Sequence, residues 1–88
     1  MAAVTVTIAN KEGLHLRVAG AIARVVQSYD AKVFLSCDGC RFVAGDSVLQ
    51  LLVLGAPCGA SVVIKADGPD ERAAVDAVSD ILINGAGI

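Results

Sequence analysis

Two spacings of apolar residues alternate along this chain, and each predicts a different kind of element. Residues 4–9 read VTVTIA, where apolar residues alternate with threonine, and a period of two is typical of a half-buried strand. Residues 16–26 instead carry apolar side chains every three or four positions, which predicts an amphipathic helix. The predicted inner face of that helix comprises Leu16, Ala19, Ile22, Ala23 and Val26.

The middle of the chain carries the pattern of a β-hairpin. Residues 32–36 and 41–44 are rich in strand-forming side chains, and the sequence CDGC lies between them. Asp38 and Gly39 suit a type I′ turn, because both central positions of that turn need a positive φ. The pattern therefore predicts two short antiparallel strands.

A short second helix is indicated by the residues at its ends. Ser47 is a good N-cap, and Gln50 stands three residues later, where it completes a capping box. Gly55 suits the left-handed position that ends a helix. The helix is therefore predicted between Ser47 and Gly55.

The last third of the chain predicts one more strand, over residues 61–66, and a final helix. Pro69 suits the first turn of that helix, and Asp70 and Glu71 complement the positive end of its dipole. Its predicted buried stripe comprises Ala74, Val78, Ile81 and Leu82.

The predicted element order is strand, helix, strand, strand, helix, strand, helix. Such an order with a central hairpin indicates an α+β fold, in which helices cover one face of an antiparallel sheet. Neither a linker nor an internal repeat interrupts the sequence, so we expect residues 1–88 to form a single domain.

Composition narrows the function classes. The chain is 56% hydrophobic and carries a net charge of −2, so it has neither the polarity of a disordered chain nor the basic stripe of a nucleic-acid-binding protein. The uncharged run over residues 47–64 is broken by Gly55 and Pro57, which argues against a membrane span. Without a visible secretory signal, and with an odd number of cysteines, we expect a cytoplasmic protein.

His15, the single histidine, stands where the first helix is expected to begin, and Arg17 follows two residues later. Backbone N–H groups at a helix N-terminus lack intrahelical partners and favour an anion. A neutral imidazole is a nucleophile, and a guanidinium matches the oxygens of a phosphate. The pair is suited to phosphoryl transfer; the alternative is an exposed capping histidine beside a solvated charge.

The sequence resembles one family over nearly its whole length. The stretch GLHLRVAG is similar to the phosphorylation motif Gly-Leu/Ile-His-x-Arg-Pro-Ala of HPr, the phosphocarrier of the bacterial phosphoenolpyruvate:sugar phosphotransferase system. The hairpin segment SYDAKVFLSCDG resembles the second strand of that family, and the segment from residue 45 to residue 78 resembles its second half. The implied fold is an open-faced β-sandwich: a four-stranded antiparallel sheet with three helices on one face, in the order βαββαβα.

The resemblance implies that His15 accepts a phosphoryl group on Nδ1 from phosphorylated enzyme I and passes it to an enzyme IIA-type protein. Arg17 would bind the phosphoryl oxygens during transfer. The implied role is that of a carrier in a relay, not of a stand-alone enzyme. Neither a cofactor nor a metal is implied, and we expect a monomer.

The short helix carries two further implications. Ser47 matches the serine that HPr kinase/phosphorylase modifies in relatives, although a plain N-cap explains it equally; Asp46 stands where many relatives carry lysine. The helix has more apolar residues than one face can bury, so we expect some to be exposed for partners. The partner-binding residues implied by the resemblance are Leu16, Arg24, Val48, Leu49 and Leu52.

The sequence departs from the family motif at Val18, where relatives carry proline. Proline fixes φ and has no N–H, so valine makes the helix start less pre-organised. We expect a looser helix start or a small change in phosphohistidine stability.

Two alternative functions remain at this point. One is a regulatory paralogue of HPr that acts by protein binding without sugar transport. The other is a small metal-binding module using Cys37 and Cys40, which form a C-x-x-C pair. Zinc needs four ligands, however, and only Cys58 and His15 remain to supply them, so incidental reduced cysteines fit the sequence better.

Overall fold

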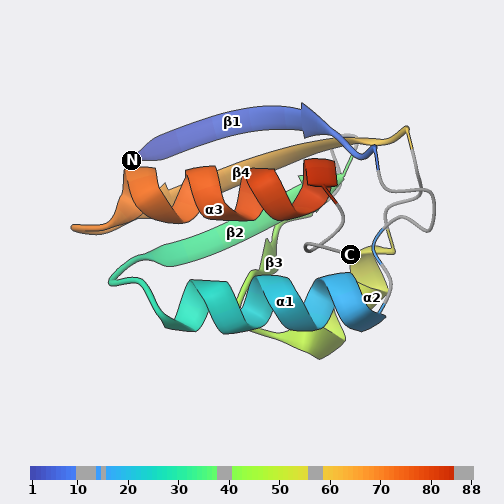
Figure 1. The fold of residues 1–88 in the computed structure, drawn as a ribbon, viewed down its shortest axis with the longest axis horizontal. Helices are drawn as coiled ribbons and strands as arrows, with labels where there is room; N and C mark the ends of the chain where they lie inside the picture. Colours follow the sequence, from blue (N-terminus) through green and yellow to red (C-terminus); the bar gives the residue numbers. More distant parts are fainter. Residues whose placement is uncertain (10–13, 15, 38–40, 56–58, 85–88) are drawn as a thin grey trace.

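The computed structural model describes residues 1–9, 14, 16–37, 41–55 and 59–84 (Figure 1). Within these ranges the predicted order of elements is confirmed. The elements are β1 (Ala2–Thr7), α1 (Leu16–Gln27), β2 (Lys32–Cys37), β3 (Val43–Ala44), α2 (Val48–Leu54), β4 (Ser61–Asp67) and α3 (Glu71–Asn84). The Asp38-Gly39 turn lies outside the described residues.

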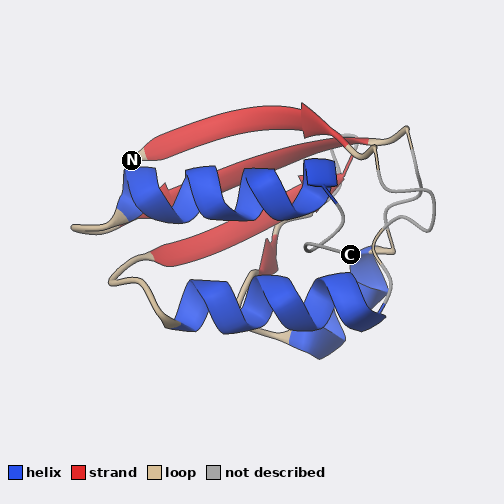
Figure 2. Cartoon of the chain, viewed as in Figure 1, coloured by secondary structure: helices blue, strands red, loops and turns tan. Residues whose placement is uncertain are grey.

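The four strands form one antiparallel sheet in the order β1-β4-β2-β3. β4 lies between β1 and β2, so Ile64 faces Val4 on one side and Leu35 on the other. Figure 2 shows α1 and α3 lying side by side in front of the sheet, and α2 packs against α1 and β3. This is the open-faced arrangement that the sequence predicts.

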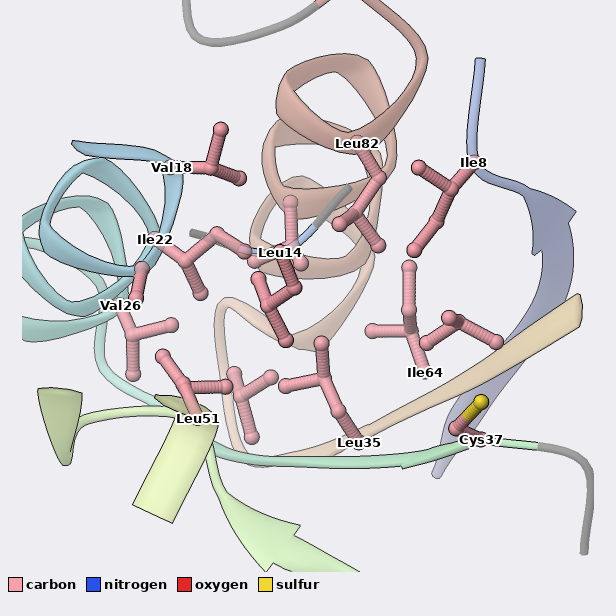
Figure 3. Close-up of a cluster of buried hydrophobic side chains, with 14 of the residues drawn as sticks. Ile8, Leu14, Val18, Ile22, Val26, Leu35, Cys37, Leu51, Ile64 and Leu82 are labelled. Atoms are coloured by element: carbon pink, nitrogen blue, oxygen red, sulfur yellow. The ribbon is translucent and has the colours of Figure 1, made fainter. Parts of the chain in front are cut away.

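The core lies between the helices and the inner face of the sheet. Figure 3 shows Ile22 of α1 and Leu82 of α3 among side chains from the sheet, such as Leu35 and Ile64. These four side chains are at most 1% exposed. Each fully buried aliphatic side chain contributes roughly 1.5–3 kcal/mol, so a core of small residues is sufficient only because many are completely buried.

The inner face of α1 differs from the prediction at its first turn. Leu16 is 66% exposed, whereas Val18 is 1% exposed and packs in the core. The other predicted residues of this face, from Ala19 to Val26, are buried. The difference arises because Val18 and Ile22 are four residues apart, as are Ile22 and Val26, and this row leaves Leu16 on the outer side.

The ends of α2 confirm the predicted caps but not the predicted capping box. The Oγ of Ser47 accepts a hydrogen bond from the N–H of Gln50 at 3.2 Å. The side chain of Gln50 does not return to Ser47; its Oε1 accepts from the N–H of Ala44 at 2.9 Å. Gly55 ends the helix in the left-handed conformation, with φ of 56°. Gln50 therefore ties α2 to β3.

The start of α3 also differs in detail. The helix begins at Glu71, so Pro69 precedes it and does not occupy the first turn. The Glu71 carboxylate accepts hydrogen bonds from the Met1 ammonium at 3.0 Å and from the N–H of Gly68 at 3.3 Å. The bond to the Met1 ammonium, followed by the bond from Gly68, lowers the pKa of Glu71.

The buried stripe of α3 is close to the predicted one. Ala74, Val78 and Leu82 are buried as expected. Val75 is also buried, whereas Ile81 is only partly buried and packs against the edge of the core. The stripe is therefore shifted by a fraction of a turn toward Val75.

Two turns at the same end of the molecule are joined by hydrogen bonds. The Asp70 carboxylate accepts from the N–H of Asp30 at 2.7 Å, and the N–H of Asp70 donates to the carbonyl of Asp30 at 3.1 Å. Gly68 has φ of 146°, and a Cβ there would lie 2.7 Å from the Asp30 oxygen and 2.8 Å from the Cα of Ala31. Only glycine allows the two turns to approach this closely.

We predict that Gly68→Ala lowers the free energy of unfolding by about 2–4 kcal/mol, because the methyl group overlaps backbone atoms and the φ is strained. Gly20→Ala is the matched control: it lies inside α1, and its Cβ would meet no atom within 4 Å. That change should stabilise the protein by about 0.5–1 kcal/mol. Urea unfolding of both variants measures the difference, and equal effects would contradict the close approach.

Candidate functional site

The first turn of α1 is anchored by two buried residues. Leu14 is 5% exposed and Val18 is 1% exposed, and Figure 3 shows both side chains directed into the same apolar cluster. α1 begins at Leu16, so His15 is the residue immediately before the helix in the sequence. His15 itself lies outside the described residues. This anchoring fixes the position of the N-terminus of α1, which His15 directly precedes in the sequence.

Arg17 is the second residue of α1, and it is exposed. The first turn of this helix contains no acidic residue, so the positive end of the helix dipole is not neutralised from within the helix. Arg17 adds a formal positive charge at the same end. The first turn of α1 is thus electrostatically suited to an anion.

A hollow lies between α1 and α2 beside Arg17. Its small residues, Gly20 and Ala21, leave space where a larger side chain would fill the gap, and a Cβ on Gly20 would meet no atom within 4 Å. The hollow is lined by Leu16, Arg17, Gly20, Ala21, Arg24 and Val48. Four of the residues predicted from the sequence, namely Leu16, Arg17, Arg24 and Val48, are therefore brought together on one surface.

The outer side of α2 continues this surface with apolar side chains. Leu49 is 73% exposed and Leu52 is 37% exposed, whereas Leu51 is completely buried. Val48 and Leu54 are partly buried against the core. The expectation that α2 exposes part of its apolar content is confirmed.

Val53 also belongs to this exposed stripe, at 78% exposure, although the sequence reasoning did not include it. It lies four residues after Leu49, on the same side of the helix, so the spacing of the two residues could have predicted its exposure. We call Leu49, Leu52 and Val53 the α2 stripe.

Ser47 stands at the start of α2 and is partly buried. Its Oγ serves the helix cap, as described above. Asp46, the residue before it, is exposed and lines a different hollow, with Val33 and Phe34 of β2. The Asp46 carboxylate is therefore not among the groups that line the hollow between α1 and α2.

The cysteines lie apart from this surface. Cys37 is 7% exposed at the end of β2, within the core, and Cys40 and Cys58 lie outside the described residues. Within the described ranges, no three His, Cys, Asp or Glu side chains gather closely enough to hold a metal ion. Among those same residues, none of the helices is long and apolar enough to cross a membrane.

Comparison with known proteins identifies relatives over almost the whole chain. A family model described as "PTS HPr component phosphorylation site" matches residues 2–84. The phosphocarrier protein HPr of Cupriavidus necator is 35% identical over 78 residues, which are 89% of this chain and 86% of that protein. The phosphocarrier protein NPr of Klebsiella oxytoca is 40% identical over 74 residues, which are 84% of this chain and 82% of that protein.

Solved structures agree with the sequence relatives. The crystal structure of HPr-C-His from Thermoanaerobacter tengcongensis matches with a TM-score of 0.91 and 30% identity, covering 100% of this chain and 98% of that one. The fold, the family match and the coverage therefore agree, and the chain belongs to the HPr family of phosphocarrier proteins of the phosphotransferase system.

Proposed function

We propose that His15 is the residue on which this phosphocarrier bears the phosphoryl group. The observation that carries the proposal is the position of Arg17: it lies two residues after His15 in the sequence, on the first turn of α1, and lines the hollow that α1 shares with α2. The family match over residues 2–84 spans this segment. The comparisons support a phosphocarrier role and do not favour the regulatory or metal-binding alternatives.

The proposed reaction is a transfer between two histidines. Phosphorylated enzyme I, which takes its phosphoryl group from phosphoenolpyruvate, is the donor. The bond from phosphorus to the donor nitrogen breaks as a bond to Nδ1 of His15 forms. In a second transfer, the bond from phosphorus to Nδ1 breaks as a bond to the acceptor histidine of an enzyme IIA-type protein forms. A neutral imidazole attacks, so His15 must be unprotonated when it accepts the group.

Positioning and charge stabilisation provide most of the catalysis in phosphoryl transfer. The N-terminus of α1 supplies backbone N–H groups and a positive dipole, and Arg17 supplies a planar guanidinium that can bind two phosphoryl oxygens together. We therefore assign Arg17 to stabilising the phosphoryl group during transfer. Val18, which replaces the proline of the family motif, packs in the core and leaves α1 beginning at Leu16.

We propose that the hollow and the α2 stripe form the docking surface for enzyme I and for the IIA-type acceptor. The exposed Leu16 and Leu49 supply apolar contact, and Val48 connects them along the hollow. Arg24 adds a positive charge at the rim, which attracts partners with acidic faces. Leu52 extends the apolar area along α2. A partner seated on this surface reaches Arg17 at its edge.

We further propose that HPr kinase/phosphorylase modifies Ser47. The residue borders the docking surface, because Val48 follows it and lines the hollow. A phosphate at the start of α2 is tolerated by the helix dipole and repels an acidic partner. We place the whole relay in the cytoplasm, with residues 1–88 acting as one domain.

The histidine assignment predicts that the protein, mixed with enzyme I and phosphoenolpyruvate, acquires an acid-labile, alkali-stable phosphate, and that His15→Ala acquires none. The chemistry requires this result because phosphohistidine is the product. Radiolabelling or mass spectrometry measures it. Equal labelling of His15→Ala would overturn the assignment.

The two arginines are predicted to act differently. Arg17→Gln should lower kcat for transfer about 10- to 100-fold, because it removes a donor that acts on the phosphoryl group itself. Arg24→Gln should raise KM for enzyme I several-fold with kcat nearly unchanged, because a rim charge affects association. Steady-state kinetics separate the two effects, and the same change in kcat for both variants would contradict the assignment of Arg17.

The two roles of Ser47 give separate readouts. Ser47→Ala should abolish labelling by HPr kinase and ATP, and it should cost about 1 kcal/mol of stability because the cap acceptor is lost. Ser47→Asn keeps a capping oxygen, so it should also lose the label but retain most of the stability. Labelling together with urea unfolding tests this, and persistent labelling of both variants would exclude Ser47 as the target.

A further inference from the structure

A hollow opens where β2 extends beyond β3. β3 has two residues and pairs with Phe34 and Leu35 of β2, so the first two residues of β2, Lys32 and Val33, lie beyond this pairing. The space beside them has a volume of about 190 Å³. We call this space the β2 hollow and define it by its lining residues, which are Val26, Ala31, Lys32, Val33, Phe34, Ala44 and Asp46.

Gly45 holds the connection from β3 to α2 close against β2. Its N–H donates to the carbonyl of Val33 at 2.8 Å. A Cβ on this glycine would lie 3.1 Å from the side chain and the carbonyl oxygen of Val33, and 3.2 Å from the side chain of Leu35. Asp46, the next residue, is thereby brought to the rim of the β2 hollow.

The inner part of the β2 hollow is apolar. Val26 of α1 and Val33 are 4% and 3% exposed, so both belong to the core as well as to the lining of the hollow. Phe34 is 39% exposed and supplies an aromatic surface, and the small Ala31 and Ala44 leave space beside it. An apolar group that entered the hollow would be removed from water, which favours its binding.

Two side chains of opposite charge border this apolar space. Lys32 on β2 and Asp46 on the connection to α2 are both exposed and both line the hollow. The one ion pair within the described ranges joins the Met1 ammonium to Glu71, so Lys32 and Asp46 are not paired with each other. Asp67 is the cross-strand neighbour of Lys32, but it does not line the hollow. Both charges are therefore available to a ligand.

We propose that the β2 hollow binds a free α-amino acid with an apolar side chain. The carboxylate of the ligand pairs with the Lys32 ammonium, and its ammonium pairs with the Asp46 carboxylate. Its side chain contacts Val33 and Phe34. The hollow is smaller than the roughly 300–1,000 Å³ of pockets for drug-sized ligands, so it suits a molecule of amino-acid size.

The two charges select a zwitterion over a simple ion. An anion attracted by Lys32 is repelled by Asp46, and a cation attracted by Asp46 is repelled by Lys32. Exposed ion pairs are individually weak, so the apolar side chain of the ligand is needed as well. We therefore expect a dissociation constant on the order of 1 mM.

Asp46 makes the site particular to this chain. Many relatives carry lysine at its position, as noted in the sequence analysis. With lysine there, both charges at the hollow would be positive, and the ammonium of an amino acid would be repelled. The selectivity for a zwitterion therefore depends on the departure from the family pattern at this residue.

The β2 hollow is separate from the proposed docking surface. It shares no lining residue with the hollow between α1 and α2. An amino acid and a docking partner can therefore be bound at the same time. The ligand joins β2 to the residue that precedes the Ser47 cap, so its binding should also raise the Tm of the protein.

The test is a titration of the ¹⁵N-labelled chain with L-leucine, followed by the amide shifts in NMR spectra. Saturable shifts are expected in residues 31–34 and 44–46. The analogue 4-methylpentanoate lacks the ammonium and 3-methylbutylamine lacks the carboxylate, so each should bind at least about fivefold more weakly.

Charge-neutralising variants test the two pairs separately. Asp46→Asn and Lys32→Gln should each weaken L-leucine binding about three- to fivefold, because each removes one exposed ion pair. Asp76→Asn makes the same change of charge at an exposed position of α3 and should leave the affinity unchanged. Dispersed amide spectra report that each variant is folded.

The outcomes that contradict the proposal are distinct. Shifts that do not saturate at tens of millimolar, or that fall on α1 and α2 instead, exclude binding at the β2 hollow. Equal binding of L-leucine and either analogue overturns the recognition of a zwitterion. An Asp46→Asn chain that binds L-leucine as tightly as the wild type removes Asp46 from the site. None of these measurements involves phosphorylation, so they are independent of the proposed function.

Discussion

The burial of the first turn of α1 is the constraint on which the rest of the site depends. Leu14 and Val18 both enter the core, one on each side of position 15 in the sequence. Their burial holds the N-terminus of α1 at the surface of the core, with Arg17 and Leu16 directed to solvent. If either apolar residue were lost, the helix would lose its anchor at the end where an anion is expected to bind.

The same constraint explains the valine that replaces the proline of the family motif. In the sequence, valine in place of proline at position 18 means that the backbone is less pre-organised for the helix. In the structure it is also a side chain with 1% exposure, packed with Ile22 and Val26 in the cluster beneath α1. The apolar packing of Val18 can hold the first turn where a proline ring would restrict φ, so the departure from the motif has a counterpart in the core.

Periodicity predicted the first strand and the two long helices, because strands and helices differ clearly in their spacing, and turn and cap residues predicted the central hairpin and the short helix α2. It was less accurate at the margins of each helix. Leu16 and Val18 are both apolar and lie two residues apart, so spacing alone could not decide which faces the core.

Gln50 matched a capping box in sequence, but the N–H of Ala44 on β3 competes for its side chain, and only tertiary structure brings these two groups together. Val53 was missed because the exposed residues of α2 were predicted from the number of apolar residues in the helix, without regard to the spacing of Val53 from Leu49. The histidine and its arginine were found from chemistry, yet the hollow beside them depends on Gly20 and Ala21, which carry no chemical signal of their own.

Gly20 lowers the stability of α1, but it leaves the hollow between α1 and α2 open to a partner. A glycine within a helix costs about 0.5–1 kcal/mol relative to alanine, and the space above this one is empty, so the core gives no reason to keep it. Its position in the hollow gives one, because a methyl group there would occupy part of the hollow that Arg17 and Val48 also line, where a partner is proposed to dock. An engineered chain optimised only for thermal stability would be expected to fill this position first. Such a chain would have a more stable α1, but part of the hollow proposed for partner docking would be filled.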